Sequence, residues 1–265
     1  MKRSINSLSE DVKTQIYGSN SEEAVSSIKS ETDKRQPVYD QVKKEKKKGY
    51  VKMITNRGSF NLQLHCDITP IACDNFLKLC ESKYFEHQSF HRLIPNFMIQ
   101  GGDPSGSGRG GQSAFGAPFP DELDSRLKHD APGVVSMANS GRKDDNKSQF
   151  FITFSPCPHL DSKHTVFGKI VGGMDEFMRL NTTATNSNDV PIAPIRIERT
   201  VVVSDPFRDC ERSADEKNEK ARQDTTDAIY IQAARSDPMA HHPNRHSMEI
   251  GKYIDWSAVE RRRIR

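Results

Sequence analysis

Hydrophobic and polar residues follow a regular pattern mainly between about residues 50 and 203 of this 265-residue chain. At the start of this region, Phe60, Leu62 and Leu64 alternate with polar neighbours, which is the spacing of a strand with one buried face. A turn at Asn56–Gly58 separates them from an apolar run that begins at Tyr50. The pattern predicts a β-hairpin here.

A helix is predicted directly after the hairpin. Thr69 is a typical N-cap residue, and Pro70 suits the first helical position because its missing N–H is not needed there. Apolar side chains then recur near helical spacing, at Ile71, Cys73, Phe76, Leu77, Leu79 and Cys80. We interpret the cysteines of this stripe as packing residues.

The remaining pattern predicts mostly strands. Apolar runs at 133–139, 148–153, 166–171 and 195–203 have strand length, whereas 174–181 has helical character. Many short strands with only two helices, neither at the spacing of a parallel sheet, favour a closed antiparallel β architecture.

Polar segments flank this core. We expect residues 1–48 to be a disordered or weakly helical lead-in, residues 49–206 to form the folded domain, and residues 207–265 to be a charged tail that is partly helical or disordered. The last residues, Trp256–Arg265, join one tryptophan to a basic cluster, which is typical of a disordered tail or a short docking segment.

Composition favours few further classes of function. The net charge of +3 is too small to predict a nucleic-acid site, and no apolar run approaches the roughly 18 residues of a membrane span. Five cysteines without paired spacing favour reduced thiols. We expect no metal: His241, His242 and His246 have no local carboxylate or thiol to complete a set.

We also expect no cofactor. Residues 106–111, with the sequence GSGRGG, match the glycine spacing of a dinucleotide loop. The helix that such a loop requires does not follow, since Gly116, Pro118 and Pro120 interrupt the next segment. We interpret the segment as a surface loop.

The stretch from Phe90 to Asp103 places one arginine, Arg92, in a mainly apolar segment. A charge is costly to bury there unless it has a partner or a ligand. Taken alone, the stretch fits a core strand with a salt-bridged arginine.

Four blocks in order give this chain a resemblance to a known family. FHRLIPNFMIQGGD (90–103), GVVSMANS (133–140), SQFFIT (148–153) and LDSKHTVFGKIVGG (160–173) resemble the cyclophilins, peptidyl-prolyl cis-trans isomerases that bind cyclosporin. The resemblance covers about residues 50–203. It implies a closed eight-stranded antiparallel β-barrel capped by two helices. It also implies an enzyme that acts on proline-containing peptides and proteins without a cofactor or metal.

The resemblance also implies site residues. Arg92 matches the family's catalytic arginine, and the resemblance implies Gln100 and Asn139 as further catalytic residues. Matches to the substrate-binding surface are Phe97, Met98, Ala138, Gln149, Phe151, Leu160 and His164. His159 stands where many members have a tryptophan that contacts cyclosporin, so the resemblance implies weakened binding of cyclosporin A.

The chain is most similar to the U-box-containing cyclophilin-like subgroup, through KKKGYVKM (46–53) and LHCDITP (64–70) with Cys66. The 48 residues before the domain are too few for a U-box, which predicts either a truncated form or a natural absence of the ligase half. The subgroup implies spliceosomal or ubiquitin-pathway partners. With the basic runs, it favours the nucleus over the cytoplasm, and we expect a monomer.

Two functions from different classes fit these residues. The first is an active prolyl isomerase. The second is a proline-directed binding or scaffold module with weak or incidental activity. The full set of Arg92, Phe97, Gln100 and Asn139 favours the enzyme, while His159 and the long polar tails favour the module.

Overall fold

The computed structural model describes residues 21–236, and the surroundings of side chains from residue 32 to residue 229. The histidines at 241–246 and the segment Trp256–Arg265 lie outside these described residues. The chain divides into two compact units, residues 1–212 and residues 213–265.

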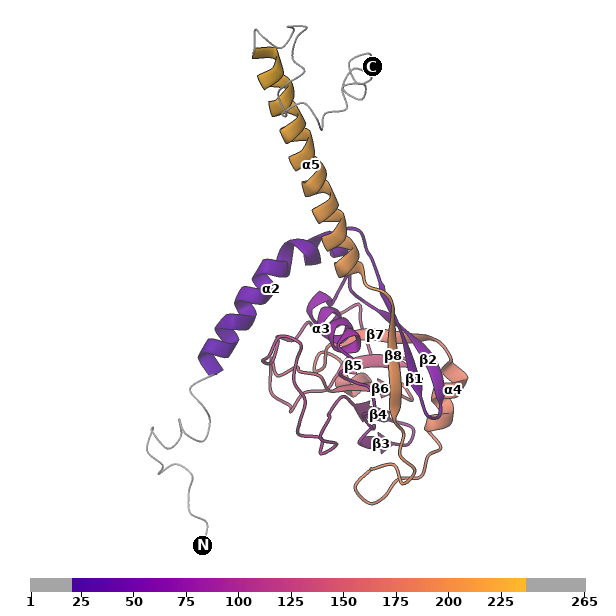
Figure 1. The fold of residues 1–265 in the computed structure, drawn as a ribbon. Helices are drawn as coiled ribbons and strands as arrows, with labels where there is room; N and C mark the ends of the chain where they lie inside the picture. Colours follow the sequence, from indigo (N-terminus) through magenta and orange to yellow (C-terminus); the bar gives the residue numbers. More distant parts are fainter. Residues whose placement is uncertain (1–20, 237–265) are drawn as a thin grey trace, which may run out of the picture. The chain divides into compact units, whose positions relative to one another are not determined.

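The first unit is built on one eight-stranded antiparallel sheet (Figure 1). Neighbouring strands follow the order β3-β4-β6-β5-β7-β2-β1-β8. The strands are β1 (Gly49–Thr55), β2 (Gly58–Leu64), β3 (Arg92–Ile94), β4 (Met98–Gly101), β5 (Val134–Met137), β6 (Phe150–Thr153), β7 (Val166–Gly172) and β8 (Ile197–Ser204). The predicted hairpin is confirmed, because β1 pairs with β2 from Gly49 opposite Leu64 to Thr55 opposite Gly58.

The two outermost strands of this order are β3 and β8. The segment just before β3 hydrogen-bonds to β8 and to the residues before it. His87 N donates to Ile197 O at 2.7 Å, Phe90 N donates to Ile195 O at 2.9 Å, and Ile197 N donates to Gln88 O at 2.8 Å. These bonds lie between the two ends of the strand order. The prediction of an eight-stranded antiparallel β fold with helices is confirmed.

Two helices pack against the sheet, α3 (Pro70–Glu81) and α4 (Met174–Leu180). Most of α3 is buried, and Phe76 on this helix lies with its ring 5.2 Å from that of Phe167 and 5.4 Å from that of Phe150. Aromatic rings at such distances bury large apolar areas and hold a helix firmly against the sheet. The positions predicted for both helices are confirmed.

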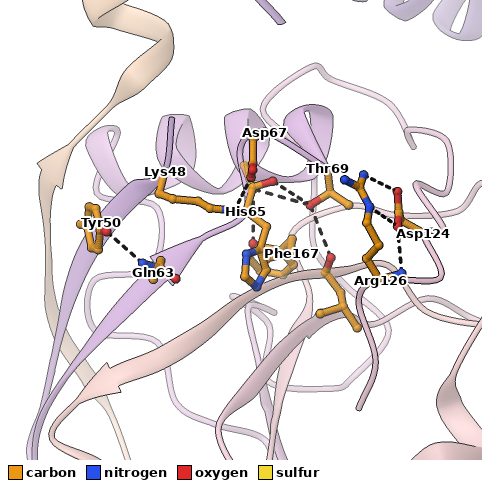
Figure 2. A network of polar contacts seen from close by, with 11 residues as sticks. Lys48, Tyr50, Gln63, His65, Asp67, Thr69, Asp124, Arg126 and Phe167 are labelled. Atoms are coloured by element: carbon orange, nitrogen blue, oxygen red, sulfur yellow. Dashed lines mark hydrogen bonds and ion pairs between the residues drawn. The ribbon is translucent and has the colours of Figure 1, made fainter. Parts of the chain in front are cut away.

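The N-terminus of α3 is capped differently from the sequence prediction. The Thr69 side chain makes no capping bond; its hydroxyl lies 3.4 Å from the carbonyl oxygens of His65 and Val166 (Figure 2). Instead, the carboxylate of Glu122 accepts hydrogen bonds from Ile71 N at 3.2 Å and Ala72 N at 2.8 Å. A carboxylate is favourable at a helix N-terminus, where free N–H groups and the helix dipole meet.

The packed region extends beyond both predicted boundaries. Helix α2 (Ser21–Lys44) lies in the predicted lead-in, yet its Tyr39 and Val42 are part of the hydrophobic core. On the other side, helix α5 (Pro206–Ser236) begins with a buried Phe207, whose ring contacts that of Tyr39 at 5.5 Å. The spacing of three residues between Tyr39 and Val42 is a helical signal that the surrounding charge obscured.

A buried carboxylate fixes this N-terminal extension. Asp74 on α3 is 2% exposed, and it accepts a hydrogen bond from the Tyr39 hydroxyl at 2.7 Å. Arg35 pairs with Asp74 at 2.8 Å and with Glu211 at 2.7 Å, so it joins α2 to α3 and α5. A buried charge must be paired and hydrogen-bonded, and this network meets that need.

All five cysteines are buried free thiols. Among the described residues, no helix combines the length and apolar character that crossing a membrane requires.

We expect Tyr39→Ala to lower the free energy of unfolding by about 3–5 kcal/mol, because it empties a core site and removes a bond to a buried carboxylate. Tyr39→Phe, which removes only the hydroxyl, should lower it by about 1–3 kcal/mol. Urea unfolding measures both, with the exposed Lys34→Ala as control. Equal stability of Tyr39→Ala and the control would show that α2 does not support the core.

Burial, with the neighbouring Lys48, lowers the pKa of His65 to about 4. The unfolded chain takes up this proton near pH 6.5, whereas the folded chain takes it up only near pH 4, so stability falls as the pH drops through this window. Because His65 is only partly buried, we expect a loss of about 1–2 kcal/mol. Urea unfolding at pH 7 and pH 5 should show a smaller loss for His65→Gln than for wild type; an equal loss contradicts the assignment.

Candidate functional site

The candidate site lies around Arg92, the first residue of strand β3. Pairing places Arg92 opposite Gln100 on β4, and Gln100 opposite Phe151 on β6. These three side chains, which are far apart in the sequence, therefore form one row across three strands. The sequence placed Arg92 and Gln100 in one continuous apolar stretch; the structure makes that stretch a hairpin, turning at Asn96 with a positive φ of 60°.

Arg92 is not buried: 45% of its side chain is exposed. Its Nε lies 3.3 Å from Oδ2 of Asp189, in the loop that precedes β8. The Leu93 N–H also donates to the Asp189 carbonyl at 2.8 Å, so this loop is fixed beside the strand. An exposed ion pair contributes little stability, but it restricts the orientation of the arginine side chain. The interpretation of the stretch as a core strand with a salt-bridged arginine is therefore wrong about burial: Arg92 has an ion pair, but it lies at the surface.

An apolar surface lies next to this row. Met98 and Phe151 are almost fully buried, and Phe97 is partly buried. Phe97 is stacked on the ring of His159 at 5.4 Å, and Phe151 meets the ring of His164 edge-on at 5.4 Å. Leu160 is partly buried in the short 3-10 helix η2 (Pro158–Leu160) that carries His159.

Polar groups line the other side. The Gln100 amide donates to Oε1 of Gln149 at 2.8 Å, and Gln149 in turn donates to the Gly110 carbonyl at 2.7 Å. The Ala138 N–H donates to the Gln149 carbonyl at 3.0 Å. Asn139 follows it, with its side chain bonded to Lys163 O at 3.3 Å. Hydrogen bonds thus connect Gln100, Gln149 and the Ala138 main chain, and Asn139 is the next residue along the chain.

His164 is held by a main-chain group. Its Nδ1 lies 3.0 Å from the Met137 carbonyl, which can only accept, so Nδ1 carries the proton. Burial lowers the pKa of His164, and the ring is therefore neutral at pH 7. A neutral imidazole with a fixed tautomer forms a wall of the site and offers one ring nitrogen as an acceptor.

Sequence reasoning missed two residues here. Asp189 lies in a polar loop with no periodic pattern, and only the fold brings it to Arg92. His129 is fully buried, is stacked on Phe151 at 5.8 Å, and its Nδ1 lies 2.9 Å from Asp161. The polar surroundings of His129 in the sequence gave no sign of burial. Within residues 21–236, no three histidine, cysteine or acidic side chains gather into a metal site.

The site therefore combines a half-exposed arginine with an apolar surface on one side and hydrogen-bonding groups on the other, all on an antiparallel β fold. A family model for cyclophilin-type peptidyl-prolyl cis-trans isomerases matches residues 50–202. The chain belongs to this family, which confirms the resemblance predicted from its sequence.

Relatives and solved structures agree. The chain is 42% identical over 220 residues to peptidyl-prolyl cis-trans isomerase 4 of Caenorhabditis elegans, covering 82% of this chain and 42% of the relative. It is 49% identical over 170 residues to peptidyl-prolyl cis-trans isomerase-like 2 of Rhizopus delemar, covering 64% of this chain and 32% of the relative. Several other relatives have the same isomerase-like 2 name, in agreement with the predicted subgroup.

A crystal structure of a cyclophilin-type isomerase from Cryptosporidium parvum matches with a TM-score of 0.59 and 40% identity, over 60% of this chain and all of that one. The chain spans less than half the length of the two curated relatives described above.

Proposed function

We propose that this chain accelerates the cis-trans rotation of X-Pro bonds in peptide and protein substrates, with Arg92 as the catalytic residue. Rotation must break amide resonance, an intrinsic barrier of about 18–20 kcal/mol. No bond is cleaved and no proton is consumed. Catalysis therefore requires only that the protein bind the twisted amide more tightly than either planar form.

The observation that carries this proposal is the position of Arg92. In the twisted amide the prolyl nitrogen gains a lone pair, which a guanidinium can meet with a hydrogen bond. The ion pair with Asp189 uses Nε, so the terminal nitrogens of Arg92 stay available as donors. Because the side chain is 45% exposed, a substrate can reach it without unfolding the strand.

The surroundings fit the two sides of the rotating bond. We infer that Phe97, Met98, Phe151 and Leu160 hold the proline ring, with His159 and His164 at the edges. Gln100, Ala138, Asn139 and Gln149 hold the flanking main chain, so that one side turns while the other is fixed. The proposal is supported by a second crystal structure of the same Cryptosporidium parvum isomerase, 41% identical with a TM-score of 0.57, determined in the presence of the dipeptide Ala-Pro.

Further proposals follow from the same resemblance. The bonds between residues 87–90 and 195–197 support a barrel that closes between β3 and β8.

We propose a monomer that acts in the nucleus with spliceosomal or ubiquitin-pathway partners. The resemblance to the subgroup and the basic runs of the sequence support this proposal. The alternative, a proline-directed binding module, is favoured by His159 alone among the site residues.

Arg92→Ala should lower kcat/KM toward an X-Pro peptide by about 10²–10³-fold, because the donor to the twisted amide is lost. Arg92→Lys should recover only a small part, since an ammonium lacks the planar fork. A protease-coupled peptide assay measures both, and Tm serves as the test of folding. Unchanged turnover in a folded Arg92→Ala variant would reject the mechanism and favour the binding module.

His159→Trp should tighten the binding of cyclosporin A by about tenfold or more, because an indole buries more apolar area than an imidazole and can donate from its ring N–H. Calorimetric titration of wild type and variant gives the two Kd values. Phe97, which stacks on His159, keeps an aromatic neighbour, and His164 is unaltered by the change. Equal Kd values would show that position 159 does not decide drug affinity in this chain.

A further inference from the structure

A cavity of about 300 Å³ lies beside Arg92 and Gln100. Its other walls come from the loop before residue 110 and from the loop before β8. The residues that line these walls include His91, Ser107, Gly108 and Asn188. None of the apolar residues assigned above to the proline ring lines it, so this cavity is a separate space that shares only Arg92 and Gln100 with the proposed catalytic surface.

His91 has no hydrogen-bonding partner among the described residues. The residue is only 8% exposed, and both ring nitrogens are buried without a contact that would satisfy them. Buried polar groups in native proteins are almost always paired, so an unpaired one needs an explanation. Because His91 lines the cavity, a group that enters it can supply the missing partner.

The wall opposite His91 is fixed in advance. The Asp103 carboxylate accepts hydrogen bonds from Ser105 N at 2.9 Å, Gly108 N at 2.7 Å and Gly110 N at 3.1 Å. Gly108 is thereby held against the imidazole: a methyl group on its Cα would lie 3.5 Å from His91 Nε2. A preformed wall of this kind reduces the entropy cost of binding.

The charges of the cavity favour a neutral ligand. Burial lowers the pKa of His91; Asp103 raises it in part, and Arg92 lowers it further. The ring is therefore neutral at pH 7, with one donor and one acceptor nitrogen. The Arg92 charge is compensated by Asp189. An ammonium entering here would meet the positive charge of Arg92, and a carboxylate would compete with Asp189 for it. An amide group carries both a donor and an acceptor, which is the complement of a neutral imidazole.

We propose that this cavity is a second substrate subsite, which binds an amide group next to the X-Pro bond, with His91 as the specificity-determining residue and Asn188 as a second polar contact. The proposal rests on the isomerase function, because Arg92 and Gln100 join the two spaces. The amide is either the side chain of a flanking asparagine or glutamine or a flanking main-chain peptide group.

Both sources are tested with matched peptides. In one arm, glutamine replaces methionine at the position before X or after the proline, and kcat/KM is compared within each pair. In the other, an ester replaces the flanking peptide bond. We expect wild type to prefer glutamine, or to lose activity on the ester, by about tenfold, or about 1.4 kcal/mol. His91→Leu should bring that ratio to about one, and Asn188→Ala should reduce it.

The control is His65→Leu. His65 also has a buried ring nitrogen without a partner, Nδ1, but it lies in the polar network of Figure 2 and does not line the cavity. This variant should keep the wild-type ratios. If Tm shows that His91→Leu is unfolded, the exposed Asn188 provides the deciding variant.

A glutamine preference that depends on His91 assigns the subsite to a side chain, and an ester effect that depends on His91 assigns it to the main chain. Ratios near one in wild type, or ratios unchanged in both cavity variants, overturn the proposal. Wild-type turnover of a peptide with alanine at the flanking positions tests the isomerase function separately. If that turnover is absent, the same ratios are measured as Kd values by calorimetry.

Discussion

The site depends on the register between strands β3, β4 and β6. A slip of one residue in a strand moves every side chain to the opposite face. With Arg92 opposite Gln100 and Gln100 opposite Phe151, the charged, polar and apolar groups of the site meet in one row. The buried Leu93 and Ile99 alternate with them and point into the core, so packing of the core fixes the register of the site.

Two carboxylates organise other parts of the same unit. Asp74 is buried and binds Tyr39 and Arg35, which brings helix α2 onto the core. Asp103 is hydrogen-bonded to the N–H groups of its own loop, which shapes one wall of the cavity beside Arg92. These hydrogen bonds lower the pKa of Asp103 against the effect of burial, which raises it. In both places the carboxylate accepts hydrogen bonds from protein groups instead of water. These bonds hold helix α2 and the loop after Asp103 in position.

Three buried histidines around the site are neutral for a common reason. Burial lowers the pKa of His91, His129 and His164. Asp161 acts in the opposite direction on His129 but does not reverse the effect of burial. Near the proposed catalytic groups, Arg92 therefore provides the permanent positive charge. This suits a reaction in which charge is redistributed within an amide and no proton is transferred.

Sequence alone determined the hairpin of β1 and β2, both packed helices and the family, because alternation, helical spacing and four ordered motifs are local signals. It did not determine which residue caps α3: Thr69 has the right chemistry, but Glu122 makes the bonds from fifty residues away. Nor did it place Tyr39 in the core, because the charges around it resemble those of a solvated tail. The Arg92–Asp189 pair and the cavity at His91 were decided by tertiary structure alone, since each joins segments with no pattern in common, and only the packing of the sheet brings them within contact distance.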